Sequence, residues 1–246
     1  IVGNETFKAK KIRDDFQSDT SNWTSWYSKD DQYSREKMSG DLERLSSFYL
    51  DRGYVDFAVD STQVSMSPDK RKMYVVANIK EGEVYTVTDI KLTGDLILKD
   101  EDLRKLLSIK SGEIFSRRKV EQSADAISAA LANIGYAFAE VNPAPEIDRE
   151  KREVGLNFQI NPGKRVYVQR ITFKGNLHTE DQVMRREMRQ LEGAWYSQAA
   201  IDRSKIRLQR LGFFETVEIE TPKVPGYPDQ VDVVINVKER NSGSFV

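Results

Sequence analysis

Three stretches of the chain alternate between apolar and polar residues. Every second residue is apolar in each stretch, as in a β-strand that buries one face and exposes the other. The apolar positions are Met73, Val75, Ala77 and Ile79 in the first stretch, Val154, Leu156, Phe158 and Ile160 in the second, and Val231, Val233, Ile235 and Val237 in the third. The pattern therefore predicts three similar strands, far apart in the sequence.

A helical spacing of apolar residues precedes each of these strands. Val120, Ala124, Ile127 and Leu131 would form one apolar helix face that ends near Gly135. Similar stretches end near Gly53 and Gly212, and the three glycines are 82 and 77 residues apart. Glycine lacks a Cβ and can close a helix in the left-handed conformation. The spacing predicts three copies of one folding unit.

Each copy reads as a strand, two helices and two further strands. The first strands cover residues 1–4, 90–95 and 171–176, short helices are predicted at residues 99–109 and 179–191, and polar turns at 66–72, 142–153 and 221–230. Thr179 with Gln182 fits a capping box. The second helix follows an aromatic residue and a capping serine in each copy, namely Tyr33–Ser34, Phe115–Ser116 and Tyr196–Ser197.

This order predicts an α+β fold of three tandem β-α-α-β-β modules, at residues 1–82, 83–163 and 164–240. In each module a three-stranded mixed sheet would carry two helices on one face, with the third strand central and parallel to the first. The second strand would lie at the edge, with unpaired backbone groups. A shift of the apolar phase at residues 85–92 and 166–173 predicts a β-bulge, or a linker that packs separately.

Composition excludes several classes of function. A net charge of −1 with 31% charged residues gives no basic field for non-specific nucleic-acid binding. The aromatic residues lie at helix starts and after the glycines, which disfavours an RNA-binding array. The absence of cysteine excludes disulfides and thiolate metal sites. The single histidine, His178, has no catalytic framework around it, so we expect no catalytic, cofactor or metal site and no enzyme activity.

The ends of the chain suggest a fragment of a longer protein. It begins with Ile1 and without a signal peptide, and no apolar run approaches the roughly 20 residues of a membrane-spanning helix.

The repeated segments resemble a known family along the whole chain. GDLERLSSFYLDRGY, NIGYAFAEV, RREMRQLEGAW, RLGFFETVEI and PDQVDVVINVKERNSGSF are similar to segments of the POTRA (polypeptide-transport-associated) domains of the BamA family, which assembles outer-membrane β-barrels. The match is to the third, fourth and fifth of the family's usual five domains. Residues 241–246 would then begin the C-terminal membrane barrel. A POTRA array from a related secretion or import pore is the alternative.

The resemblance implies a non-catalytic array on the periplasmic face of the bacterial outer membrane. Its expected partners are unfolded outer-membrane protein precursors, its own C-terminal barrel and accessory lipoproteins, with BamD at the last module and BamB nearer the first. No cofactor and no nucleic acid is implied. An exposed strand edge could receive precursor strands by β-augmentation, which uses backbone hydrogen bonds and tolerates many sequences.

We expect the precursor-binding edge in the second strand of the first module, which alternates, has one charge and lacks the lysines that block edges. Its residues are Val59, Asp60, Ser61, Thr62, Gln63, Val64, Ser65 and Met66. Packing of Val59, Val64 and Met66 into a core is the competing interpretation of those side chains. Proline at Ser65 would weaken binding if the Ser65 N–H faces outward.

For the BamD contact, the resemblance points to Glu192. Arg185 and Arg189, four residues apart on one predicted helix face, could line the same contact. A solvated surface is the alternative interpretation of all three. In the first module Trp23, Trp26 and Tyr27 lie in a longer segment between the helices, where we expect them to be buried; exposed tryptophans there would instead indicate a docking site.

Overall fold

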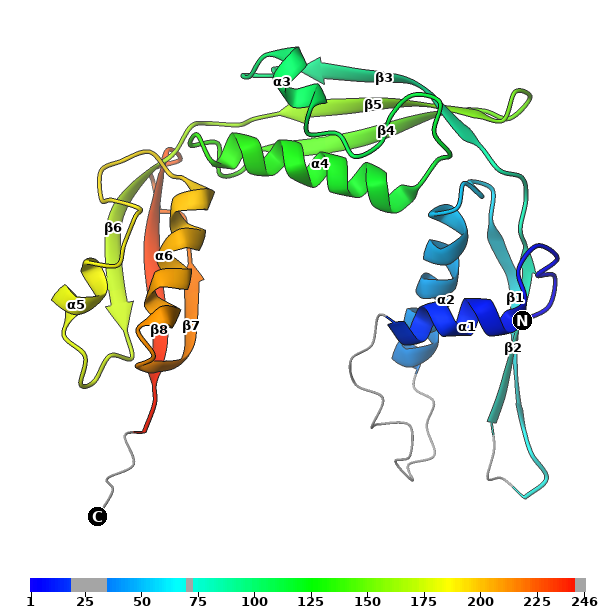
Figure 1. Ribbon diagram of the computed structural model, residues 1–246, viewed down its shortest axis with the longest axis horizontal. Helices are drawn as coiled ribbons and strands as arrows, with labels where there is room; N and C mark the ends of the chain where they lie inside the picture. The colour runs from blue at the N-terminus through cyan, green and yellow to red at the C-terminus, as the bar shows by residue number, and fades with distance from the viewer. Residues whose placement is uncertain (19–34, 70–72, 242–246) are drawn as a thin grey trace. The chain divides into compact units, whose positions relative to one another are not determined.

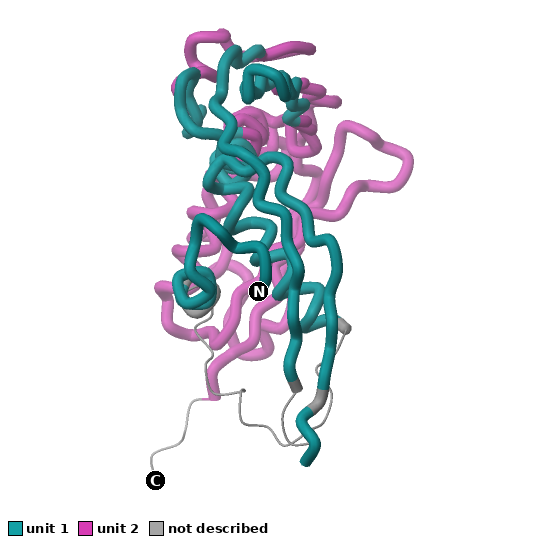
Figure 2. The backbone as a smooth tube through the Cα atoms, turned by 90° about the vertical axis from the view of Figure 1, so that its right-hand side faces the viewer, with its two compact units in different colours: residues 1–91, 107–123, 143–157 teal, residues 92–106, 124–142, 158–246 magenta. Residues whose placement is uncertain are grey.

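The computed structural model describes residues 1–18, 35–69 and 73–241, and its contacts divide the chain into two units. Unit 1 holds residues 1–91, 107–123 and 143–157, and unit 2 holds residues 92–106, 124–142 and 158–246 (Figure 2). Along the sequence, the predicted element order is complete in the second and third modules. The first module lacks a named first strand.

The elements of the three modules are as follows. The first contains α1 (Ala9–Ser18), α2 (Arg35–Leu50), β1 (Ala58–Met66) and β2 (Met73–Lys80). The second contains β3 (Thr86–Gly94), α3 (Asp100–Arg104), α4 (Arg117–Ala132), β4 (Glu140–Asp148) and β5 (Glu153–Asn161). The third contains β6 (Tyr167–Lys174), α5 (Asp181–Arg185), α6 (Gln198–Arg210), β7 (Phe214–Glu220) and β8 (Gln230–Glu239). In the first and third modules the long helix covers one face of the sheet (Figure 1).

The third strand of each complete module is central, as predicted. The sheet orders are β3-β5-β4 and β6-β8-β7, and β8 pairs parallel with β6 and antiparallel with β7. In the first module the described sheet has two strands, β1 and β2, instead of the predicted three. Val2 takes the place of a first strand through a parallel bridge to Asn78. The prediction of an α+β fold with mixed sheets is confirmed.

Apolar faces hold the helices on the sheets. In the third module Val231, Val233 and Ile235 of β8 are fully buried, and they share one core with Ile201 and Leu208 of α6. Fully burying a side chain of this size contributes roughly 1.5–3 kcal/mol. The alternating strand and the helical stripe predicted from the sequence are thus the two sides of one core.

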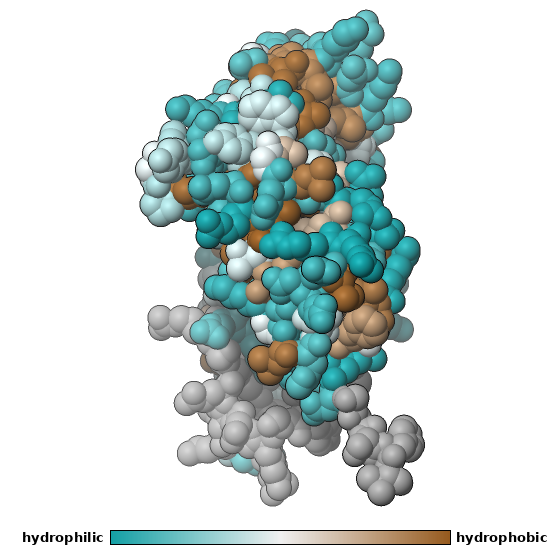
Figure 3. Space-filling view, turned by 90° about the vertical axis from the view of Figure 1, so that its left-hand side faces the viewer, coloured by the Kyte–Doolittle hydropathy of each residue, from teal (hydrophilic) through white to brown (hydrophobic). Residues whose placement is uncertain are grey.

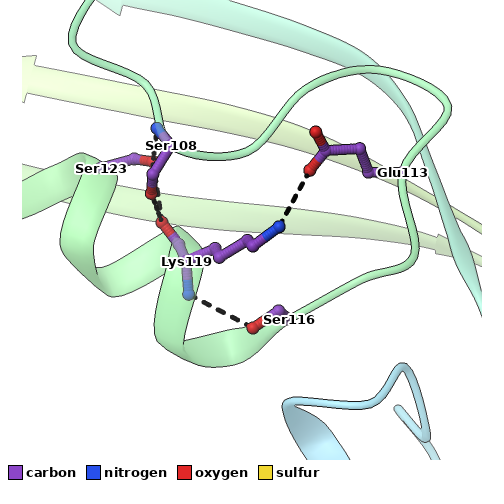
Figure 4. Close-up of polar contacts among 5 residues, drawn as sticks. All are labelled: Ser108, Glu113, Ser116, Lys119 and Ser123. Atoms are coloured by element: carbon purple, nitrogen blue, oxygen red, sulfur yellow. Dashed lines mark hydrogen bonds and ion pairs between the residues drawn. The ribbon is translucent and has the colours of Figure 1, made fainter.

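Several local predictions are also confirmed. The pairing of β6 with β8 changes register between Val168 and Ile171, which is the predicted bulge. Ser197 accepts a hydrogen bond from the Ala200 N–H at 3.3 Å, and Ser116 does the same for the Lys119 N–H at 3.3 Å (Figure 4). Gly53, Gly135 and Gly212 have φ values of +92°, +107° and +75°, the left-handed region expected at these helix ends. The capping residue Ser34 and the residues Trp23, Trp26 and Tyr27 lie outside the described residues.

Other local predictions are wrong. The helix expected at residues 179–191 ends at Arg185, and Leu191 is 63% exposed. Its N-cap is Glu180 rather than Thr179, without a side-chain capping bond. The Thr179 N–H instead donates to Glu239 Oε1 at 2.9 Å, so a distant carboxylate replaces the local cap.

The turn predicted at residues 142–153 begins too early. Strand β4 continues to Asp148, and the turn that follows leads into β5 at Glu153. Pro143 and Pro145 lie inside this strand. An edge strand tolerates proline where the missing N–H would point away from the sheet.

A helix-capping contact recurs within each unit. In unit 1, Asp51 Oδ1 accepts a hydrogen bond from the Arg118 N–H in the first turn of α4, at 2.9 Å. In unit 2, Asn133 Oδ1 accepts from the Ala199 N–H in the first turn of α6, also at 2.9 Å. Both capping residues stand two positions before a helix-ending glycine. The first and second modules therefore each supply a cap to the second helix of the module that follows.

Candidate functional site

The outer edge of β1 can be assigned from the contacts of its neighbour, β2. The Ala77 C=O accepts from the Val2 N–H and the Ile79 N–H donates to the Val2 C=O, both at 2.8 Å. The backbone groups of successive strand residues point to opposite sides. Those of Ala77 and Ile79 point toward Val2, so those of Val76 and Asn78 point toward β1.

The register of the β1–β2 pair carries this assignment to β1. Gln63 lies opposite Val76, and Thr62 and Val64 lie opposite Ala77 and Val75. The backbone groups of Gln63, and by alternation those of Ser61 and Ser65, therefore bond to β2. Those of Thr62 and Val64 point away from the sheet. Among the described residues, no other element forms a backbone hydrogen bond with them.

The side chains leave this edge accessible. Ser61, Gln63 and Ser65 are exposed, and Val64 is 53% exposed rather than packed in a core. Val59 packs partly against the core of the first module. Between it and Ser61 the register shifts, so Asp60 forms a bulge at the start of the edge. A bulge of this kind bends the strand and leaves the following residues in a regular ladder.

The edge strands that correspond to β1 in the other two modules, β4 and β7, differ from it in ways that affect pairing. Pro143 and Pro145 of β4 lack N–H groups. They stand two positions apart, so their backbone groups point to the same side, and this side must be the outer one because proline cannot donate to the ladder with β5. Strand β7 carries three glutamates in FETVEIE, and charge on an edge opposes strand addition. Of the three strands β1, β4 and β7, only β1 combines complete donors with a single charge.

In the third module, Glu192 and Arg185 meet at the bulge of β6. The Ile171 N–H donates to Glu192 Oε1 at 2.8 Å, and Arg185 Nη2 donates to the Ile171 C=O at 3.0 Å. Arg185 also lies 3.5 Å from Glu192 Oε1 and stacks over the Phe173 ring at 5.1 Å. The carboxylate and the guanidinium together bond the backbone groups that a neighbouring strand would otherwise bond. Both side chains remain 45% exposed.

Arg189 does not share a helix face with Arg185, contrary to the prediction, because α5 ends at Arg185. Its Nη1 donates to the C=O groups of Arg186 and Met188, at 3.3 and 3.1 Å. Its backbone N–H donates to Ser204 Oγ at 2.8 Å. The structure thus brings Arg185 and Glu192 into contact, and Arg189 folds back on its own turn.

Comparison with known proteins decides the family. A sequence model of the POTRA family, described as a surface antigen variable number repeat, matches residues 1–82, 85–163 and 166–240. The chain belongs to the POTRA family.

Solved and curated POTRA proteins agree with this assignment. The crystal structure of Haemophilus influenzae BamA POTRA3-5 superposes with a TM-score of 0.79 at 31% identity, covering 96% of this chain and 93% of that one. The outer membrane protein assembly factor BamA of Neisseria meningitidis is 30% identical over 99% of this chain, and that of Buchnera aphidicola is 32% identical over 100%. The chain spans 31% and 40% of those two proteins.

A pair of glutamates in this POTRA chain was missed by sequence reasoning. Glu81 follows β2 and accepts the Thr6 N–H at 2.9 Å, and Glu239 ends β8 and accepts the N–H groups of His178 and Thr179 at 3.0 and 2.9 Å. Each carboxylate bonds a segment near the start of its module, after Val2 in the first module and after β6 in the third, to the end of the module's last strand. The signal was present in the sequence, because both glutamates follow an apolar residue and a lysine at the same place in the repeat.

Partial desolvation by itself would raise the pKa of Glu239. The backbone hydrogen bonds from His178 and Thr179 favour the carboxylate, and the net effect is a pKa below its ordinary value of 4.5.

The third POTRA module also exposes apolar side chains. Leu177 is 87% exposed, Leu191 63% and Trp195 48%. The face shown in Figure 3 carries apolar patches separated by hydrophilic side chains. The Arg165 guanidinium lies 4.2 Å from the centre of the Trp195 ring. Apolar groups beside cations are typical of a protein-binding surface.

The described residues contain no group of three or more His, Asp or Glu side chains able to hold a metal ion. Within the same residues no helix has the length and apolar character needed to cross a bilayer.

Proposed function

We propose that this chain is a non-catalytic periplasmic region of an outer-membrane β-barrel assembly factor, and that β1 receives segments of unfolded outer-membrane proteins as an added strand. The curated relatives are named as outer membrane protein assembly factors. A receptor for many barrel proteins has to bind chains of different sequence, and backbone pairing at a sheet edge provides that tolerance.

The outward backbone groups of Thr62 and Val64 carry this proposal. They offer two donors and two acceptors next to exposed side chains, on an edge with one charge. Asp60, the charged residue, lies 3.9 Å from Lys80 of β2, which partly balances it. The prolines of β4 and the glutamates of β7 make those edges poorer acceptors of a strand.

We propose a second contact in the third module, for the accessory lipoprotein BamD, at Glu192 and Arg185 with Arg189 nearby. Glu192 Oε1 is bonded to Ile171, so a partner would approach the exposed remainder of the carboxylate. The exposed Leu191 and Trp195 would add apolar contact area. BamB is expected nearer the first module.

A pair of proline variants tests the strand-binding edge. Val64→Pro removes an outward donor without breaking the β1–β2 ladder, whereas Ser65→Pro removes an N–H that bonds β2. A synthetic peptide from a barrel strand is titrated into the 15N-labelled chain. The unaltered chain should show amide shifts at Thr62 and Val64. Val64→Pro should weaken binding about three- to tenfold, the effect of one hydrogen bond.

Ser111→Pro is the control for adding a proline, because Ser111 lies in an exposed turn outside the strands. Ser65→Pro should disturb the amides of β2 even without peptide. Peptide-induced shifts confined to other strands, or unchanged affinity in Val64→Pro, would contradict the assignment of β1.

A further inference from the structure

Gln190 is a buried amide whose side chain bonds along a single loop. It is 2% exposed, and its Nε2 donates to the C=O groups of Leu191 and Trp195 at 3.2 and 3.1 Å. Its Oε1 accepts from the Ser197 N–H at 2.8 Å. One side chain therefore joins the beginning, middle and end of residues 191–197, which we call the 191–197 loop.

The second module builds the same turn without an amide. Ile109, fully buried, stands at the position of Gln190, four residues after Lys105 as Gln190 is four after Arg186. In both modules a glycine N–H bonds the first strand at 2.7 Å, from Gly112 to the Val87 C=O and from Gly193 to the Val168 C=O.

The serine beneath the turn is repeated as well. Ser123 Oγ accepts the Ser108 N–H at 3.0 Å and donates to the Lys119 C=O at 2.7 Å (Figure 4). Ser204 Oγ accepts the Arg189 N–H at 2.8 Å and donates to the Ala200 C=O at 2.7 Å. An apolar residue at the position of Gln190 is therefore compatible with the backbone path.

A buried amide is costly unless its hydrogen bonds are made, so its presence where an isoleucine suffices calls for a reason. All three bonds of Gln190 restrain the 191–197 loop itself. That loop presents Leu191 and Trp195 to solvent and carries Glu192. Restraining a binding loop before the partner arrives lowers the entropy lost on binding.

We propose that Gln190 is a positioning residue, which preorganises the 191–197 loop for a protein partner. This inference rests on the proposed lipoprotein contact in the third module. Gln190 itself is buried and does not touch the partner. It acts through Leu191, Glu192 and Trp195.

The test replaces Gln190 with the residue of the second module. Gln190→Ile keeps an apolar filling and removes all three bonds. In the full 246-residue chain, amide exchange at Ser197 should become about tenfold faster, because its N–H loses its acceptor. Exchange at Val233, in the central strand, should not change. The dissociation constant for purified BamD should rise about three- to tenfold, mainly through faster dissociation.

Gln190→Met, which keeps the length of the side chain, gives the same test if Gln190→Ile does not fold. Gln209→Ile, on the exposed face of α6, is the matched control and should change neither quantity. Gln190→Glu keeps an acceptor for the Ser197 N–H, and its protonated carboxyl group can donate to one of the two carbonyl groups. Slow exchange at Ser197 should therefore return below the pKa of the new carboxyl group.

The outcomes separate this proposal from the proposed function. Unchanged exchange at Ser197 would overturn the claim that Gln190 orders the loop. Faster exchange with unaltered BamD affinity would overturn its positioning role, while the lipoprotein contact would stand. If the unaltered chain does not bind BamD, the contact itself is rejected, and the positioning role with it.

Discussion

Two glycine-to-alanine substitutions in the third module should have very different costs. Gly175 and Gly212 have similar φ values, +88° and +75°, so alanine at either position adopts a left-handed conformation that costs about 1–2 kcal/mol. The surroundings differ. A Cβ at Gly175 would lie 2.0 Å from the Val237 carbonyl oxygen, whereas a Cβ at Gly212 has no neighbour within 4 Å.

The contact at Gly175 cannot be relieved by rotating a side chain, because the obstructing atom is backbone. The end of β6 must move away from β8, and one or two ladder hydrogen bonds would weaken, at about 1 kcal/mol each. Gly175→Ala should therefore lower the free energy of unfolding of the third module by roughly 3 kcal/mol or more. Gly212→Ala should lower it by only about 1–2 kcal/mol.

Trp195 can report on the third module alone. The chain has three tryptophans, so a Trp23→Phe/Trp26→Phe background leaves Trp195 as the fluorescent probe during urea unfolding. Linear extrapolation then gives the free energy of each variant. Equal costs for the two substitutions, within about 0.5 kcal/mol, would refute the steric reasoning.

Two further predictions concern the sheet edges and the carboxylate clamp. Replacing Pro143 and Pro145 together with valine restores two outward N–H donors on β4. The barrel-strand peptide should then shift the amide signals of β4 as well as those of β1. Shifts at β1 alone would contradict the role assigned to the prolines. The pKa of Glu239 is lowered in the folded chain, so its stabilising effect is complete above the unfolded value and is lost as the pH falls through the folded value. Unfolding midpoints of the unaltered chain and of Glu239→Gln should therefore differ at about pH 6 and converge as the pH falls well below 4.5, and a constant difference would contradict the clamp.

Repetition made much of the fold predictable. A single amphipathic stretch is ambiguous, but the same glycine, capping serine and alternating strand at three places in the chain restrict the possible topologies strongly. The central place of β5 and β8 followed from their regular alternation, since a strand flanked on both sides buries its apolar face most completely. The bulge before Ile171 followed from a change of apolar phase, which a regular strand cannot accommodate.

Predictions failed where a distant residue supplied a hydrogen bond. Thr179 and Gln182 fit a local capping box, but Glu239, 60 residues away in sequence, takes the Thr179 N–H. The pattern at Pro143 and Pro145 indicated a turn, because proline interrupts most strands. An edge strand tolerates proline. The sequence of one strand does not show whether it lies at an edge, because that depends on how all the strands of the sheet pair. Gln190 reads as an ordinary polar residue until its burial is known.

The direction of the backbone groups in β1 shows this limit most clearly. Side-chain alternation indicates which residues face the helices. It does not indicate which residues of β1 bond to β2 through their backbone, because either hydrogen-bond pattern is compatible with the same side-chain faces. A bulge at Asp60 also moves the pairing by one residue. From sequence, Ser65 and Val64 are equally good positions for a proline test. The bonds of Val2 remove the ambiguity, because they fix which residues of β2 point toward β1. In the proposed function, a precursor strand would therefore pair with Thr62 and Val64, and its register on the edge would follow from theirs.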